Sequence, residues 1–113
     1  MSSSSTITEA EREGRPLGRY AMPGEVLAGL FLDPLGLTAR DLAERIGDDE
    51  ARMQALLDGE VRMDADLALK LGRAFGTKPT YWTNLQTARD LRVRQEALGS
   101  DLERIEPYDL EAA

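Results

Sequence analysis

Apolar residues recur at helical spacing in two adjacent stretches near the middle of the chain, between Thr38 and Gly59. Each stretch has apolar side chains three or four residues apart, which is the pattern of a helix with one buried face. These apolar positions are Leu42, Ala43, Ile46, Met53, Leu56 and Leu57. Gly47 separates the two stretches, where a tight turn needs a residue that accepts a positive φ. The pattern predicts a helix-turn-helix unit.

Three further amphipathic stretches predict helices at about residues 24–32, 64–76 and 79–98. All five predicted helices have start signals (proline, aspartate or threonine) and stop signals (mostly glycine) at their ends. The start signals are Pro23, Thr38 with Asp41 as its capping partner, Asp48 or Asp49, Asp64 or Asp66, and Pro79. The stop signals are Asp33–Pro34 with Gly36, Gly47, Gly59, Gly76 and Gly99.

Composition supports one all-α domain. The chain has 113 residues, of which 42% are apolar and only 5% aromatic, so its core has to consist mainly of aliphatic side chains. We expect a disordered, serine-rich extension over residues 1–20 and a helix-turn-helix domain over 21–99 that ends in a dimerisation helix. Residues 100–113 are expected to form an acidic tail. In the last helix, we expect Trp82 to be buried in the core.

The residue types that the chain lacks narrow its chemistry. It contains no cysteine and no histidine, which removes disulfides, thiolate nucleophiles, the commonest general base and the usual zinc ligands. We expect no cofactor and no metal, and we predict that the chain is not an enzyme. No apolar run is long enough to span a bilayer, and the N-terminal residues lack a hydrophobic signal core. The prediction is a cytoplasmic protein without a membrane partner.

Charge complicates the helix-turn-helix prediction. The chain has 14 basic and 21 acidic residues and a net charge of −7, whereas dedicated nonspecific nucleic-acid binders are usually basic. The second helix of a DNA-binding unit lies in the major groove, yet residues 48–60 contain five acids and a single base, Arg52. An acidic surface also suits a basic protein partner.

The candidate DNA-contacting residues lie near the two helix starts of the unit and just after its second helix. They are Thr38, Arg40, Asp49, Glu50, Arg52, Gln54 and Arg62. Thr38, Arg40 and Arg62 have side chains suited to phosphate contacts. Gln54 has the chemistry to read adenine.

Three of these candidates have two interpretations each. Arg52 can read guanine, or it can be a solvated helix residue paired with Asp48 or Asp49 on the preceding turn. Asp49 and Glu50 stand where a recognition helix would begin. There they either repel the phosphates or accept hydrogen bonds from cytosine amino groups.

Three segments together resemble the HigA-type antitoxins of bacterial toxin–antitoxin modules. They are PGEVL at 23–27, the helix-turn-helix at 38–59, and AFGTKPTYWTNLQTARDL at 74–91. The resemblance covers roughly residues 20–107, and the last segment is its more specific part. It implies a five-helix Cro/lambda-repressor-like domain that forms a homodimer and binds its own operator DNA. It also implies neutralisation of a cognate basic toxin, a HigB-type ribonuclease that cuts messenger RNA at the ribosome.

The chain departs from this family at the recognition helix. Asp48 stands where the family commonly has a small apolar residue, and Asp49 and Glu50 stand where it commonly has polar or basic residues. Two functions are therefore considered. The first is a dimeric autorepressor that also binds a toxin. The second is a toxin-binding module on a helix-turn-helix scaffold, with little or no DNA affinity. A solitary regulator without a toxin is a third option.

Two surfaces near the C-terminus are candidates for protein contacts. The last predicted helix has more apolar positions than one small core needs, with Leu85, Leu91 and Leu98 in register, and this predicts a dimer interface in its C-terminal half. The acidic tail has five acids and one base, with Ile105 and Tyr108 as apolar anchors. Such a tail can lie across a basic toxin, or it can be a plain disordered terminus.

Overall fold

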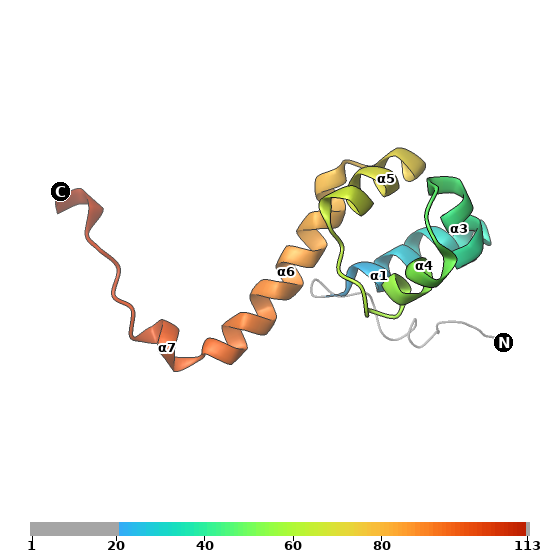
Figure 1. Cartoon of the computed structure of the whole chain (residues 1–113). Helices are drawn as coiled ribbons and strands as arrows, with labels where there is room; N and C mark the ends of the chain where they lie inside the picture. Colours follow the sequence, from blue (N-terminus) through green and yellow to red (C-terminus); the bar gives the residue numbers. More distant parts are fainter. Residues whose placement is uncertain (1–20, 113) are drawn as a thin grey trace.

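The computed structural model describes residues 21–112, and every regular element within them is helical (Figure 1). The expected all-α class is therefore confirmed. The extension predicted for residues 1–20 lies outside the described residues. In the described part of the chain, no helix is both long and apolar enough to cross a membrane.

The described chain has five main helical segments followed by two short ones. The first segment is continuous through α1 (Pro23–Val26), the π-helix η2 (Leu27–Leu32) and α2 (Asp33–Leu35). The other four are α3 (Ala39–Ile46), α4 (Glu50–Leu57), α5 (Ala65–Phe75) and α6 (Pro79–Leu98). The short segments are α7 (Ser100–Glu103) and the 3-10 helix η3 (Leu110–Ala112).

The first helical segment extends further than the sequence predicts. The predicted stop is Asp33–Pro34 with Gly36, because an interior proline lacks an N–H and its ring collides with the carbonyl of the preceding turn. The helix does not stop at Asp33–Pro34 but continues through Pro34, and it ends at the predicted Gly36, which has a φ of 68°. The turn before Pro34 is a π-helix, in which the N–H of Asp33 donates to the carbonyl of Ala28, five residues earlier. This wider turn leaves room for the proline ring.

Seven side chains form the fully buried centre, and all five main segments contribute to it. They are Leu27, Leu42, Met53, Leu56, Leu67, Leu71 and Trp82. The predicted burial of Trp82 is confirmed, since its ring centroid lies 5.0 Å from those of Phe31 and Tyr81. Its indole Nε1–H donates to the hydroxyl of Thr77 at 2.8 Å, so the buried N–H is satisfied.

Helices α1 and α4 approach with their backbones in near contact at Gly24. A Cβ atom at this position would collide with the carbonyl oxygen of Leu56 and would lie 3.0 Å from the Cα of Leu57. Because glycine has no Cβ, it permits this approach. Gly24 therefore sets how closely α4 packs against the first segment.

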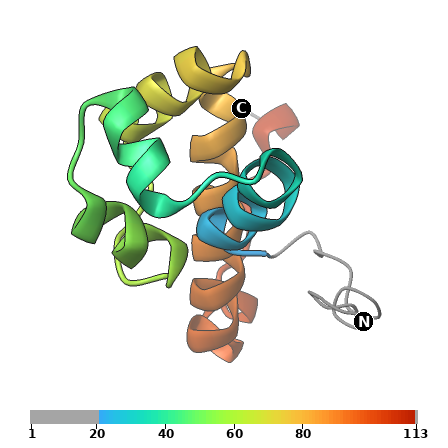
Figure 2. The same ribbon diagram turned by 90° about the vertical axis from the view of Figure 1, so that its right-hand side faces the viewer.

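The C-terminal half of α6 extends away from the other helices (Figure 1, Figure 2). Leu91, Val93 and Leu98 of this half are exposed, with exposed fractions of 65%, 47% and 37%. Gly99 ends the helix with a φ of 46°, as predicted, and α7 follows. This short helix was not predicted from the sequence.

Substitution of Trp82 by alanine should lower the free energy of unfolding by about 3–5 kcal/mol, because a large buried ring and its hydrogen bond are both lost. Chemical denaturation followed by circular dichroism measures the change. Leu69→Ala is the control, because Leu69 is 59% exposed and its truncation should cost less than about 0.5 kcal/mol. Equal stability of Trp82→Ala and the wild type would contradict the central packing role of this residue.

Candidate nucleic-acid interface

The helix-turn-helix unit consists of α3, the turn at 47–49 and α4. Thr38 caps α3: its hydroxyl accepts from the N–H of Asp41 at 3.1 Å, and the Asp41 carboxylate accepts from the N–H of Thr38 at 2.9 Å. These bonds confirm the predicted capping pair, and they hold the pKa of Asp41 below its ordinary value. Gly47 ends α3 with a φ of 69°. Local interactions thus fix the direction in which the chain enters α4.

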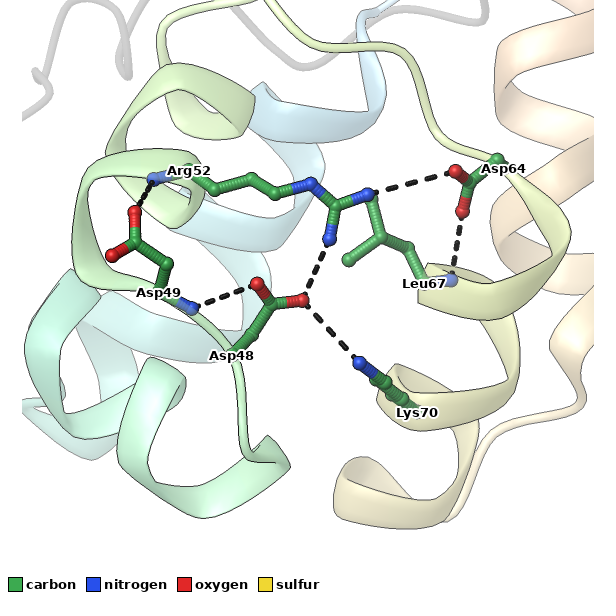
Figure 3. Close-up of polar contacts among 6 residues, drawn as sticks. All are labelled: Asp48, Asp49, Arg52, Asp64, Leu67 and Lys70. Carbon is green, nitrogen blue, oxygen red and sulfur yellow. Dashed lines mark hydrogen bonds and ion pairs between the residues drawn. The ribbon is translucent and has the colours of Figure 1, made fainter.

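Asp48 is the centre of a polar cluster between α4 and α5 (Figure 3). Its side chain is only 9% exposed. One carboxylate oxygen accepts from the guanidinium of Arg52 at 2.7 Å and from the ammonium of Lys70 at 3.4 Å, and the other accepts from the N–H of Asp49 at 2.7 Å. Burial alone would raise the pKa of Asp48, but this N–H and the two cations outweigh it and lower the pKa.

Two neighbouring acids cap helices. Asp49 accepts from the N–H of Arg52 at 3.0 Å at the start of α4, and Asp64 accepts from the N–H of Leu67 at 2.9 Å at the start of α5. Asp64 also lies 3.6 Å from the Arg52 guanidinium, which therefore bridges Asp48 and Asp64. Figure 3 shows this side chain crossing from α4 towards α5. The interpretation of Arg52 as the partner of Asp48 is confirmed.

The exposed face of α4 carries other side chains. Glu50, Ala51, Gln54 and Asp58 are all exposed, and Gln54 donates from its amide to Asp58 at 3.1 Å. Two predicted contact residues, Glu50 and Gln54, therefore lie one turn apart on a face that DNA can approach. Ala51 was not predicted, although a small exposed residue at the start of a recognition helix permits close approach to DNA. The small side chain of Ala51 is the feature of the sequence that could have identified it.

Two other predicted residues lie at the start of α3. The hydroxyl of Thr38 accepts a hydrogen bond in the cap but keeps its own proton to donate. Arg40 is 72% exposed and pairs with Glu44 at 3.3 Å. Because an exposed pair of this kind contributes little free energy, it does not hold Arg40 back from a phosphate.

Arg62 takes a different position from the other predicted residues, because it contacts α6. Its guanidinium donates two hydrogen bonds to the carboxylate of Asp90, and these bonds lower the pKa of Asp90. The Gln86 side chain accepts from the N–H of Met63 at 2.9 Å and donates to Asp90 at 3.1 Å. We call these four residues the loop–α6 link. It connects the loop after α4 to the long C-terminal helix.

The sequence reasoning missed three cations on α3 and α5. Arg45, Lys70 and Arg73 line a shallow groove of about 480 Å³ beside the turn. The three-residue spacing of Lys70 and Arg73 on α5 places them on one side of that helix, and this was the available signal. Among the described residues, no group of acidic, histidine or cysteine side chains is arranged to hold a metal ion.

Known proteins share the fold of this chain, although no family model matches it. Antitoxin HigA-1 of Vibrio cholerae is 41% identical over 79 residues, which is 66% of this chain and 74% of the relative. The chain belongs to the HigA family of antitoxins. A HigA-family addiction-module antidote protein from Coxiella burnetii has a TM-score of 0.74 and 35% identity, covering 80% of this chain and all of that one. Pseudomonas aeruginosa HigA, solved with the higBA promoter, has a TM-score of 0.74 and 28% identity, covering 80% and 99%.

The structure accounts for one departure of this HigA antitoxin from its family. Asp48 stands where the resemblance implies a small apolar residue, and a mostly buried carboxylate without partners would be costly there. Here it accepts hydrogen bonds from Arg52 and Lys70. The acid and its two cations therefore form one structural unit.

Substitution of Asp48 by asparagine should lower the free energy of unfolding at neutral pH by about 1–2 kcal/mol, since Arg52 and Lys70 lose their shared carboxylate. Folding lowers the pKa of Asp48, so the charged form stabilises the folded state above the unfolded pKa, and this contribution disappears as the pH falls. The difference between wild type and Asp48→Asn should therefore shrink below about pH 4. Thermal denaturation across pH measures it.

Glu44→Gln is the matched control, because Glu44 is 67% exposed and pairs only with exposed Arg40 among the described residues. This substitution should leave the free energy of unfolding nearly unchanged both at neutral pH and in acid. A stability loss in Asp48→Asn of the same size in acid and at neutral pH would contradict the ion-pair explanation.

Proposed function

We propose that this chain is an antitoxin that binds its own operator as a homodimer and neutralises a cognate basic toxin, a ribonuclease of the HigB type. The main structural support for DNA binding is the polar cluster around Asp48. Because Asp48 pairs with Arg52, and Asp49 and Asp64 accept from helix N–H groups, these acids repel DNA less than their number suggests. The operator lies in the cytoplasm, where this activity would take place.

Similarity to P. aeruginosa HigA, which was solved with the higBA promoter, supports the same proposal. The alternative, a toxin-binding module with little DNA affinity, depended on the acidic charge of α4. Internal pairing of Asp48 and capping by Asp49 reduce the weight of that argument. The exposed α4 face with Ala51 and Gln54 instead has the size and chemistry for contact with base edges.

Substitution of Ala51 by glutamate should abolish binding to the chain's own upstream DNA while leaving toxin neutralisation unchanged. The new side chain adds bulk and negative charge on the exposed face of α4, and an acid in the first helical turn does not destabilise the helix. A mobility-shift assay measures DNA binding, and growth rescue on co-expression with the toxin measures neutralisation. Thr80→Glu introduces the same side chain at an exposed position in the first turn of α6, outside its projecting half, and should preserve both activities. Retained operator binding by Ala51→Glu would contradict the assignment of α4.

The proposed dimer uses the projecting half of α6. Leu91 and Leu98 are seven residues apart, so they lie on one side of this helix, and both are exposed. A second α6 packed on this side would cover them. Two recognition helices would then face successive turns of DNA, as helix-turn-helix dimers require.

Substitution of both Leu91 and Leu98 by lysine should convert the dimer to a monomer. Two charges in a desolvated interface have no partners there, so association becomes unfavourable. Sedimentation velocity at a concentration on the order of 10 μM measures the oligomeric state, and operator affinity should fall with it. Leu69→Lys places a lysine at an exposed leucine outside α6 and should stay dimeric. A monomeric wild type would contradict the proposed interface.

The acidic tail is proposed as part of the toxin-binding surface. Ile105, Tyr108 and Leu110 have exposed fractions of 69%, 92% and 84%, and five acids surround them in sequence. An extended segment with apolar anchors and negative charge suits the surface of a basic ribonuclease.

A further inference from the structure

The acids in and beside the recognition helix α4 differ in the hydrogen bonds and ion pairs that they form within the fold. Asp48 binds two cations, and Asp49 caps α4. Asp58 accepts from Gln54. Glu50, the first residue of α4, is exposed, and its carboxylate forms no hydrogen bond or ion pair with any residue that the structure describes. The carboxylate oxygens of Glu50 can therefore accept hydrogen bonds from a bound molecule.

Glu50, Gln54 and Asp58 form a row along one exposed edge of α4, because residues four apart lie one above the other on a helix. The amide of Gln54 donates towards Asp58, so its carbonyl oxygen is left towards solvent. The row therefore presents mainly hydrogen-bond acceptors. Arg52, the base of this helix, is held on the other side by Asp48 and Asp64.

The major groove offers donors to such a row at specific bases. Cytosine presents its N4 amino group and adenine its N6 amino group, whereas guanine presents the acceptors N7 and O6. A carboxylate accepts well from cytosine N4 and is repelled by a guanine edge. An arginine in this row would prefer guanine, but Arg52 is not available for that contact.

We propose that Glu50 is a specificity-determining residue, which accepts a hydrogen bond from the amino group of a cytosine in each operator half-site. The inference depends on the proposed function, because it concerns the same DNA interface. Its carboxylate weakens contact with every duplex through repulsion of phosphates, and it favours the duplex that has a cytosine amino group in reach. Glu50 thus lowers overall affinity and raises discrimination.

Site selection from a randomised duplex library tests this inference. The four proteins are the wild type, Glu50→Ala, Glu50→Gln and Glu103→Ala, which removes an exposed carboxylate from α7. The wild type should select cytosine at one position of each half-site, with about tenfold discrimination against other bases. Glu50→Ala should lose this preference, Glu50→Gln should shift it to adenine, and Glu103→Ala should retain it. Thermal denaturation should show that all four proteins are folded.

Titration of the selected duplex and of a scrambled duplex separates base reading from simple repulsion. If Glu50 reads cytosine, Glu50→Ala should bind the scrambled duplex more tightly while the ratio of the two affinities falls about tenfold. If both affinities rise by the same factor and the selected sequence is unchanged, the inference is overturned and the proposed function stands. A wild type that binds no duplex would overturn both.

Discussion

The ion-pair cluster at Asp48 holds the start of the recognition helix against α5, and the geometry of the proposed interface depends on it. The Asp48 side chain is mostly shielded from solvent, and two cations balance its charge. Arg52 approaches from α4 and Lys70 from α5, which connects the two helices through one acid. The exposed face of α4 is oriented by this connection at its start and by the close backbone approach of Gly24 at its C-terminal end.

Net charge is a poor guide to the surface of this protein. The chain has a net charge of −7, yet several acids near the recognition helix bind backbone N–H groups or cations within the fold. A cap satisfies helix donors that would otherwise need water, and the acid then contributes to the helix end. The charge of the surface around the helix-turn-helix is therefore set by the acids that remain exposed, such as Glu50, and by cations such as Arg40 and Arg45.

Features that depend on neighbours in sequence were predictable, and features that depend on distant residues were not. The Thr38–Asp41 cap and the turn at Gly47 follow from local chemistry, and both are confirmed. The partner Lys70 lies 22 residues from Asp48, and Arg62 is 28 residues from Asp90, so no local pattern could place these pairs. The passage of the first helix through Pro34 also escaped prediction, because a π turn has no clear sequence signal.

The loop–α6 link connects the recognition helix α4 to the long helix α6. Arg62 and Met63 are bound to Asp90 and Gln86 shortly after α4 ends, so these hydrogen bonds connect the loop after α4 to α6. In a dimer of such subunits, the crossing angle of the two α6 helices would set the distance between the two α4 helices. One inserted base pair lengthens the DNA by about 3.4 Å and rotates the second half-site about the duplex axis. The dimer would therefore discriminate between operators by the spacing of their half-sites as well as by their base sequence.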